Sequence, residues 1–286
     1  MSTRVAILTP DPEDEGHRSR WRDVFERQAS PLREVGMEVA GPSWADPGGL
    51  TAFDLAMPLL VWGYHRAGAQ WQEAVGRWEA GGVRLMNPPS VLRWNADKLY
   101  LGRLAERNAP VVPTLYADRC TEEVMAEAAA QLGTDRLIAK PQVSASAWQT
   151  IRWSPGQPLD GAPAGPAMIQ PYLPAIESEG EISLIYLGGA FSHSIRKRPQ
   201  PGDFRVQPEY DGVITPHAPA RDELDAAEAV LAEVEEPLLY ARIDFVRGLD
   251  GKPALMELEL VEPDLYLGYD AEAPGRFAQA VRLASG

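Results

Sequence analysis

The stretch ARIDFVRGLDGKPALMELEL, residues 241–260, decides the fold predicted for this chain. Two apolar runs flank Asp250 and Gly251, and an Asp-Gly pair between such runs favours a tight β-hairpin turn. Because side chains alternate along a strand, Glu257 and Glu259 are expected to point the same way. The sequence therefore predicts a C-terminal hairpin that carries two carboxylates on one face.

Asp244 interrupts the apolar run of the first strand of this hairpin, and a short turn would bring it close to the paired glutamates. The apolar residues that alternate with the glutamates, Met256 among them, should point into the opposite layer. Carboxylates that share a face repel one another unless a cation lies among them, and oxygen-only ligands suit Mg²⁺, which is usually shared with substrate phosphates. The alternative is a solvated strand face with salt bridges to Arg242 or Arg247, and the pattern alone favours neither interpretation.

Composition and charge narrow the class of function. The chain has 286 residues and a formal net charge of −14, whereas general binding to nucleic acids or membrane surfaces needs a basic face. No apolar run reaches the roughly 20 residues that span a bilayer, and the N-terminal segment lacks the basic region and cleavage site of a signal peptide. We therefore expect a cytoplasmic protein. Its single cysteine, Cys120, rules out an internal disulfide and a cysteine-rich zinc site.

Up to about residue 88 the sequence alternates between apolar runs and amphipathic segments. This order predicts an α/β unit with a parallel sheet, and such sheets bind ligands beyond the carboxyl ends of their strands. Length alone leaves the number of domains open. Strands are predicted at 4–9, 37–44, 53–65 and 83–87, and helices at 19–36 and 67–80.

From about residue 90 the pattern is typical of an α+β architecture. A segment rich in Pro and Gly, residues 155–166, is expected to be a surface linker. Hairpins are predicted around Gly188 and Gly189 and around the Asp-Gly pair of the opening stretch. The other predicted elements are helices at 90–107, 121–133, 221–234 and 274–284, and extended segments at 109–117, 135–142 and 167–174.

Lysine is scarce, because arginine supplies most of the positive charge, and only three lysines precede residue 250. Lys140 ends a predicted strand, where few lysines are needed for solubility. Lys98 falls near a helix start, and a helix N-terminus favours anions. A single lysine is usually a surface residue, but the placement of these two favours a functional role.

Two further segments could bind phosphates. The loop VSASA, residues 143–147, is small and hydroxyl-rich, so backbone N–H groups around Ser144 and Ser146 could approach phosphate oxygens, although a plain turn is the alternative. The sequence contains neither a Walker loop nor GxGxxG after its first strand. The basic run SIRKRPQPGDFR, residues 194–205, is unusual in so acidic a chain. On a strand, Lys197 would face opposite to its neighbouring arginines, so one face could meet anions while the other meets solvent.

The order of these parts resembles the ATP-grasp superfamily, in particular its glutathione-synthetase-like branch. The two lysines, the small-residue loop, the segment QPYLPAIESEGE, the basic strand and the acidic hairpin follow one another over residues 88–284. Within that branch, RWNADKLYL, FSHSIRKRPQPGDFRVQ and ELELVEPDLYLG are most similar to the subgroup of O-ureido-serine cyclo-ligase, which acts in cycloserine biosynthesis. The resemblance implies a Rossmann-like preATP-grasp α/β domain at 1–88, an ATP-grasp N-lobe at 89–170 and a C-lobe with a metal site at 171–286.

The resemblance also implies roles for individual residues. Tyr172 and Leu173 would read the adenine edge through their backbone, and either Glu177 or Glu181 would bind ribose. Glu259 departs from the branch, since glutathione synthetase has Asn there; a carboxylate still binds Mg²⁺, but glutathione substrates are then not expected. The other implied residues are phosphate-binding Lys98 and Lys140, hinge residue Gln170, catalytic Lys197 and Arg205, metal ligands Asp244, Glu257 and Glu259, and substrate contacts Glu262, Asp264 and Tyr266.

The implied activity is ATP- and Mg²⁺-dependent ligation of a carboxylate to an amine, with Mn²⁺ as a second metal option. A carboxylate is a poor electrophile, so phosphorylation to an acyl-phosphate would activate it toward the amine of a small amino-acid-like substrate, within one molecule in a cyclo-ligase. The alternatives are an intermolecular peptide or amino-acid ligase and a non-catalytic, nucleotide-binding regulatory protein. His65 and His193 are candidate general bases, and a structural role is the alternative for both. The resemblance suggests a homo-oligomer, either a dimer or a tetramer.

Overall fold

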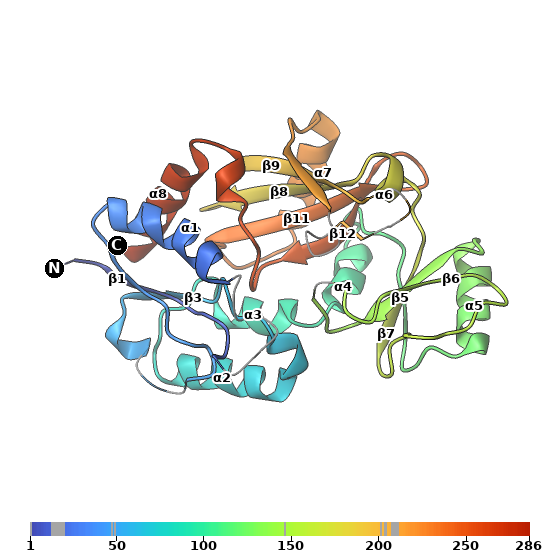
Figure 1. Cartoon of the computed structure of the whole chain (residues 1–286), viewed down its shortest axis with the longest axis horizontal. Helices are drawn as coiled ribbons and strands as arrows, with labels where there is room; N and C mark the ends of the chain where they lie inside the picture. Colours follow the sequence, from blue (N-terminus) through green and yellow to red (C-terminus); the bar gives the residue numbers. More distant parts are fainter. Residues whose placement is uncertain are drawn as a thin grey trace.

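Three β-sheets with helices packed around them make up the described part of this computed structural model (Figure 1). The structure describes residues 2–12, 21–46, 48, 50–145, 147–200, 202, 205–206 and 212–286. None of the helices within these ranges is long and apolar enough to cross a membrane. The mixture of a parallel sheet with antiparallel sheets confirms the predicted α/β and α+β architecture.

The first sheet contains three parallel strands in the order β2-β1-β3, as the sequence predicts. Its central strand is buried because α1 covers one face and α2 covers the other, the latter through Trp71 and Trp78. Two short 3₁₀ helices lie between these elements. The bounds are β1 (Arg4–Ile7), α1 (Trp21–Glu34), β2 (Glu38–Ala40), η2 (Leu50–Ala52), β3 (Leu55–Met57), η3 (Tyr64–Arg66) and α2 (Gly68–Ala80).

The apolar run predicted as one strand at 53–65 is only partly extended. The strand ends at Met57 because Pro58 follows it, and proline has no N–H to continue the ladder. Leu59 and Leu60 remain buried in the core, but they lie in a turn that leads into η3. The shortened strand matters for the site, because it lets residues 62–65 turn toward the rest of the chain.

The predicted strand at 83–87 is wrong. Only Leu85 forms a bridge, to Ala56 on β3, before the chain leaves the sheet. The cause lies at Asn87, whose fully buried side-chain amide donates hydrogen bonds to two carbonyl groups, one at the start of β11 (Tyr240–Arg247) and one just after β12 (Pro253–Glu259). Buried carbonyl groups need hydrogen-bond partners, so Asn87 turns toward these two groups and the strand does not continue in the first sheet.

The helix predicted at 90–107 is two helices, α3 (Pro89–Asn95) and α4 (Tyr100–Glu106). Between them the Asp97 carboxylate accepts a hydrogen bond from the backbone N–H of Leu99 at 3.0 Å, a local turn that competes with helix formation. The backbone N–H of Lys98 instead donates to the carbonyl of Gln142 at 3.0 Å. The break therefore fixes Lys98 against the segment that follows β5.

The second sheet has four antiparallel strands in the order β4-β7-β5-β6, and Figure 1 shows it at one end of the molecule beside α5. Its apolar core includes Met125 and Ala128 of α5. Helix α5 starts at an N-cap, Thr121, and ends at Gly133, which has φ 66°. The bounds are β4 (Leu115–Ala117), α5 (Glu122–Leu132), β5 (Leu137–Pro141), β6 (Ile151–Trp153) and β7 (Ala167–Pro171).

The third sheet has five strands in the order β10-β9-β8-β11-β12, and its antiparallel pairs include both predicted hairpins. One face packs on α3, α4 and α7, and the other packs with α8 against α1 and the first sheet. The bounds are α6 (Ala175–Ser178), β8 (Glu181–Leu187), β9 (Ala190–Arg198), β10 (Val213–Pro216), α7 (Arg221–Leu231), β11 (Tyr240–Arg247), β12 (Pro253–Glu259), η5 (Leu267–Tyr269) and α8 (Ala273–Ser285).

The C-terminal hairpin contains a β-bulge that changes one predicted side-chain direction. Asp244 is opposite Glu257, but the next residue, Phe245, is opposite Leu255, so Met256 is the extra residue of β12. Met256 consequently lines the cavity instead of pointing into the opposite apolar layer. The prediction for Met256 was wrong because strict alternation does not hold across a bulge.

Candidate active site

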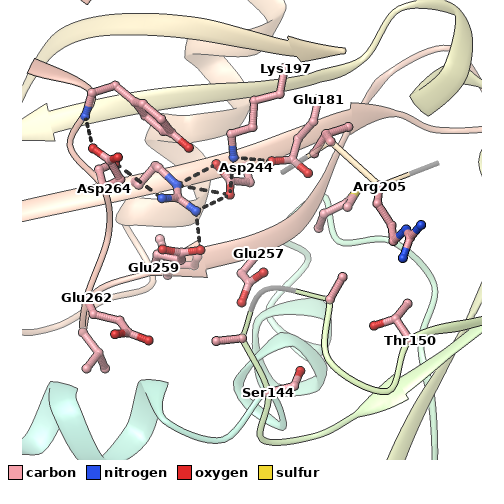
Figure 2. A pocket seen from close by; sticks show the side chains of 18 of the residues that line it. Ser144, Thr150, Glu181, Lys197, Arg205, Asp244, Glu257, Glu259, Glu262 and Asp264 are labelled. Atoms are coloured by element: carbon pink, nitrogen blue, oxygen red, sulfur yellow. Dashed lines mark hydrogen bonds and ion pairs between the residues drawn. The ribbon is translucent and has the colours of Figure 1, made fainter. Parts of the chain in front are cut away.

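One large cavity, of about 1040 Å³, lies where the second and third sheets meet α1 and η3, and Figure 2 shows part of its interior. Its lining comes from segments far apart in the sequence, which the fold brings together. Most of the residues that the sequence analysis selected are among them: Lys98, Lys140, Ser144, Gln170, Tyr172, Leu173, Glu181, Lys197, Arg205, Asp244, Glu257, Glu259, Glu262, Asp264 and Tyr266.

Two predicted residues do not appear among the described lining residues. Ser146 lies outside the described residues. Glu177 lies beside the cavity, where its carboxylate accepts a hydrogen bond from the hydroxyl group of Tyr172 and pairs with Arg152 at 3.4 Å. Of the two glutamates predicted as ribose ligands, Glu181 alone faces the cavity.

The break between α3 and α4 directs Lys98 into the cavity. Its Nζ donates to the carbonyl of Ser144 at 2.5 Å and lies 2.9 Å from Glu257 Oε1. Burial raises the pKa of Glu257, but Lys98 and Lys140 outweigh burial and hold that pKa below its usual value. Glu257 is therefore an ionised carboxylate, held between two lysines.

Lys140, on β5, is the second lysine of this group. Burial is the largest effect on its pKa and lowers it, whereas the charge of Glu257 acts to raise it. Within the described part of the chain, Lys140 forms no ion pair as close as that of Lys98. A partly buried, cavity-facing ammonium with so little compensation is well suited to bind an anion.

Lys197 confirms the predicted alternation of the basic strand, since it is buried while Arg198 is exposed. Its Nζ lies 2.5 Å from Glu181 and 3.3 Å from Asp244. Burial and then Arg242 act to lower the pKa of Lys197, but the two carboxylates outweigh them and raise it. The pKa of Glu181 is itself raised, mainly by burial and against the effect of Lys197.

Arg242 is the residue of the site whose role the sequence analysis missed. It is only 7% exposed, and its Nη2 donates to Asp244 at 3.0 Å and also to Glu259 (Figure 2). Burial acts to raise the pKa of Asp244, but Arg242 and Lys197 lower it to about 2. The available signal was the two-residue spacing from Asp244, which puts both side chains on one face of β11. The salt bridge to Arg242 that the alternative interpretation included does form, but it lies at the cavity and not on a solvated strand face.

The predicted metal ligands Asp244, Glu257 and Glu259 share this wall without forming one cluster. Within the described ranges, no three Asp, Glu, His or Cys side chains converge as a metal ion would need. Lys98 and Arg242 lie between them instead. Burial raises the pKa of Glu259 to about 8, even though Arg242 opposes it. Oxygen-only donors of this kind are those that Mg²⁺ prefers, so the residue types fit the predicted metal.

The three predicted substrate residues line the cavity beyond the end of β12. Asp264 accepts a hydrogen bond from the backbone N–H of Tyr266 at 2.9 Å, a turn that holds the loop in place. The ring of Tyr266 lies 5.5 Å from Lys197 Nζ. In Glu262, by contrast, Oε2 is buried and has no hydrogen-bond partner among the described residues.

An apolar pocket at the end of β7 surrounds the predicted adenine site, with Leu173, Val206 and Met256 among its members. The backbone N–H of Tyr172 donates to a carbonyl of the chain at 2.8 Å. For the backbone carbonyl of Tyr172 and the N–H of Leu173, the described residues provide no such partner. One acceptor and one donor, side by side, are therefore available at the rim of an apolar pocket.

The opposite wall comes from α1 and η3. Asp23 and Arg27 lie one turn apart on α1 and both line the cavity, as do Tyr64 and His65. The His65 ring is 6.2 Å from the ring of Trp148, in the loop before β6. This contact joins the loop that contains Ser144 to the N-terminal part of the chain.

His193, the other candidate base, is a structural residue. It is 5% exposed, lies outside the lining, and its Nε2 is 3.0 Å from the carbonyl of Leu265. Burial lowers its pKa, so the ring is neutral near pH 7. Of the two histidines, His65 is the one that faces the cavity.

A small antiparallel sheet facing a larger one across a cavity with lysines on both sides is the architecture of ATP-grasp ligases. Solved structures of such enzymes share the fold. D-cycloserine synthetase DcsG matches with a TM-score of 0.84 at 23% identity, covering 99% of this chain and 100% of that chain. D-alanine–D-alanine ligase from Bacillus anthracis matches with a TM-score of 0.68 at 15% identity, covering 99% and 97%.

Sequence comparison gives the family within that class. Residues 5–87 match the N-terminal domain of D-cycloserine synthetase DcsG. Cycloserine biosynthesis protein DcsG from Streptomyces lavendulae is 31% identical over 226 residues, which are 70% of this chain and 73% of that protein. The chain belongs to the DcsG family of ATP-grasp ligases, as its sequence motifs predicted. It is an ATP-dependent ligase that forms C–N bonds, and solved ATP-grasp ligases of the same fold hold ATP or Mg and ADP.

Proposed function

We propose that this enzyme phosphorylates the carboxylate of a small amino-acid-like substrate with ATP and joins the resulting acyl-phosphate to a nitrogen of the same molecule. The observation that carries the proposal is that three buried cations, Lys98, Lys197 and Arg242, and the less buried Lys140 line one cavity. Phosphoryl transfer depends on positioning and on neutralising phosphate charge, and these residues supply both.

The cations form two groups, one for the phosphates of ATP and one for the phosphoryl group during its transfer to the substrate. Lys98 and Lys140, beside Ser144, come from the side of the second sheet and are suited to hold the ATP phosphates. Lys197 and Arg205 come from the third sheet and the loop after it, and they are suited to meet the γ-phosphate and the acyl-phosphate. Arg242 lies beside Lys197 and extends the same positive surface toward the substrate carboxylate.

The carboxylates of β11 and β12 would hold Mg²⁺ together with the phosphates. Asp244, Glu257 and Glu259 are the residues for this role, since their partners Lys98 and Arg242 can pair with phosphate oxygens instead. Bound there, Mg²⁺ would neutralise charge on the phosphates during transfer. Mn²⁺ has the same preference for oxygen ligands, and we expect it to support activity.

The nucleoside is proposed to bind at the end of β7. The free carbonyl of Tyr172 and N–H of Leu173 match the amino group and ring nitrogen on the edge of adenine, above Met256 and Val206. Gln170 stabilises this strand by donating to Thr114 at 2.8 Å. Glu181 is the better ribose ligand, because Glu177 is held outside the cavity.

Ring closure within one molecule is proposed because the family relative is a cycloserine protein and because the resemblance extends to the cyclo-ligase subgroup. The direct test is release of ADP from ATP and Mg²⁺ with O-ureido-serine, offered as the D and the L form, followed by mass spectrometry of the product. A cyclic product without any added amine supports the proposal. If no acid and amine combination stimulates ADP formation while ATP still binds, the chain is a nucleotide-binding protein without ligase turnover.

One observation favours an intermolecular ligase as the second candidate. Asp23 and Arg27 offer opposite charges one helical turn apart at the cavity wall, an arrangement suited to the charged ends of a separate amino acid. In that case ADP formation requires two amino acids together, and neither one alone suffices. The same assay with single and paired amino acids separates the two functions.

A further inference from the structure

Glu262 is a carboxyl group of the cavity with an unusual environment. It lines the cavity, yet its Oε2 is buried without a hydrogen-bond partner among the described residues. A buried polar atom left without a partner costs about 1 to 3 kcal/mol, so such atoms need an explanation. A carboxyl group that lines the cavity and has an unsatisfied oxygen points to a group that is completed by a ligand.

The position of Glu262 along the chain indicates which part of a ligand it would meet. Met256 belongs to the apolar pocket proposed for adenine, and Glu257 and Glu259 follow at the phosphates and the metal. β12 ends at Glu259, and Glu262 follows in the bend beyond the end of the strand. In Figure 2, Glu262 lies on the opposite side of the cavity from Arg205 and Thr150.

The cavity-lining carboxylates on β11 and β12 already have cationic partners. Glu257 pairs with Lys98, Glu259 with Arg242, and Asp244 with Arg242 and Lys197. For Glu262 the described residues provide no ion pair. An N–H donor or a cation entering here would gain a hydrogen bond without breaking an existing one, and by favouring the ionised form of the carboxyl group it would make that bond charge-assisted.

The groups around Glu262 are acidic, basic and phenolic. On β12 they are Glu257 and Glu259, and on the other elements they are Lys98, Arg242 and the buried Tyr64 of η3. Burial and then Glu259 raise the pKa of Glu262 well above its usual value, even though Lys98 and Arg242 oppose them. This environment disfavours a second anion, such as a phosphate or the substrate carboxylate, and favours a nitrogen that donates hydrogen bonds.

We propose that Glu262 accepts a hydrogen bond from the attacking nitrogen of the substrate and holds it toward the activated carboxyl carbon, with Tyr64 closing the subsite from η3. As the C–N bond forms, the bond between the carboxyl carbon and the phosphate oxygen breaks, and the departing inorganic phosphate takes up the proton that the nitrogen loses. This inference rests on the proposed acyl-phosphate function and deepens it, because it assigns the second half of the reaction to a separate residue. It follows that Glu262 serves C–N bond formation and not phosphoryl transfer.

The experiment separates those two half-reactions by trapping the intermediate. ADP, C–N bonded product and hydroxamate are measured for the wild type and Glu262→Gln with O-ureido-serine, ATP, Mg²⁺ and hydroxylamine, a small nucleophile that captures acyl-phosphates. Losing a charge-assisted hydrogen bond of about 1.5 to 3 kcal/mol corresponds to a fall of roughly 10- to 150-fold. We expect Glu262→Gln to lose product by that factor, while ADP formation persists and hydroxamate increases.

Controls make the outcomes distinct. Glu272→Gln changes a carboxylate that is 86% exposed and paired with Arg276, and it should behave as the wild type in all three measurements. Tyr64→Phe should move the ratio of product to ADP in the same direction as Glu262→Gln, and far-ultraviolet circular dichroism verifies that each variant is folded.

Three results would contradict the proposals, and they differ from one another. If wild type forms product but never hydroxamate, the acyl-phosphate function fails. If Glu262→Gln retains the wild-type ratio of product to ADP, the role of Glu262 is overturned. If this variant loses ADP formation and needs much more Mg²⁺, Glu262 acts on the metal and not on the nitrogen.

Discussion

Lys98 and Glu257 form an ion pair across the cavity, with 2.9 Å between Nζ and Oε1, although one precedes α4 and the other lies on β12. The pair exists because α3 and α4 are separate helices, which frees Lys98 to point inward. It brings the lysine proposed for phosphate next to a carboxylate proposed for metal, so the two functions meet at one contact.

Glu257→Gln should abolish catalysis without unfolding the chain. The amide keeps the shape of the side chain, and Lys98 keeps its hydrogen bond to Ser144 at 2.5 Å, but the negative charge for the metal is lost. We expect ADP formation to fall by about 100-fold or more, as for other single electrostatic contributors to a transition state. The measurement is ADP release together with circular dichroism, with the exposed, ion-paired Glu73 changed to Gln as control. Near-normal turnover would refute the metal role.

Arg242→Met should destabilise the protein far more than a surface arginine would. The change leaves Asp244 and Glu259 buried beside a side chain that cannot pair with them. Breaking a buried ion pair from one side costs about 3 to 5 kcal/mol, whereas an exposed pair contributes at most about 1 kcal/mol. Urea unfolding at pH 7 measures the difference, and Arg107→Met, whose side chain is 53% exposed, is the matched control. Equal losses in the two variants would contradict the importance of this network.

Glu181 and Glu177 can be separated as ribose ligands by combining variants with deoxynucleotides. Glu181 lines the cavity, whereas Glu177 bonds to Tyr172 outside it. If Glu181 binds a ribose hydroxyl group, Glu181→Gln should raise the KM for ATP by roughly tenfold, and Glu177→Gln should change it little.

Glu181 also pairs with Lys197 at 2.5 Å, so loss of that ion pair in Glu181→Gln would raise the KM for ATP as well. Deoxynucleotides separate this effect from loss of a contact with the ribose. The wild type should prefer ATP to 2′-deoxy-ATP or 3′-deoxy-ATP, and Glu181→Gln should lose that preference. Wild-type discrimination in Glu181→Gln, with its loss in Glu177→Gln, would reverse the assignment.

The sequence predicted those parts of the site that depend on local rules. The C-terminal hairpin followed from its Asp-Gly turn and apolar alternation, and the burial of Lys197 followed from its place on a basic strand. Met256 was predicted wrongly because a bulge depends on the register of β11, which no local pattern contains. Lys98 lay in a predicted continuous helix, which is broken partly by a contact with the distant Gln142.

Residues defined by partners from other elements were the least predictable. Arg242 was considered only as a surface salt bridge, because its burial depends on how Glu259 and the following loop cover β11. The environment of Glu262 depends equally on Tyr64, which η3 brings from the N-terminal part of the chain. Such contacts require the three-dimensional arrangement, although the residue types alone made these positions worth examining.

His193 should make the protein sensitive to acid without taking part in catalysis. Burial lowers the pKa of the folded-state ring below its usual value of 6.5, so the unfolded chain binds a proton more readily. Stability is then retained above about pH 6.5 and lost as the pH falls below it, because acid favours the state that takes up the proton. Urea unfolding at about pH 5.5 and pH 7.5 should show that His193→Gln has a smaller loss at the lower pH, while ADP formation at neutral pH stays within about threefold. An unchanged pH dependence would remove His193 as the cause, and loss of activity in a folded variant would restore it as a candidate base.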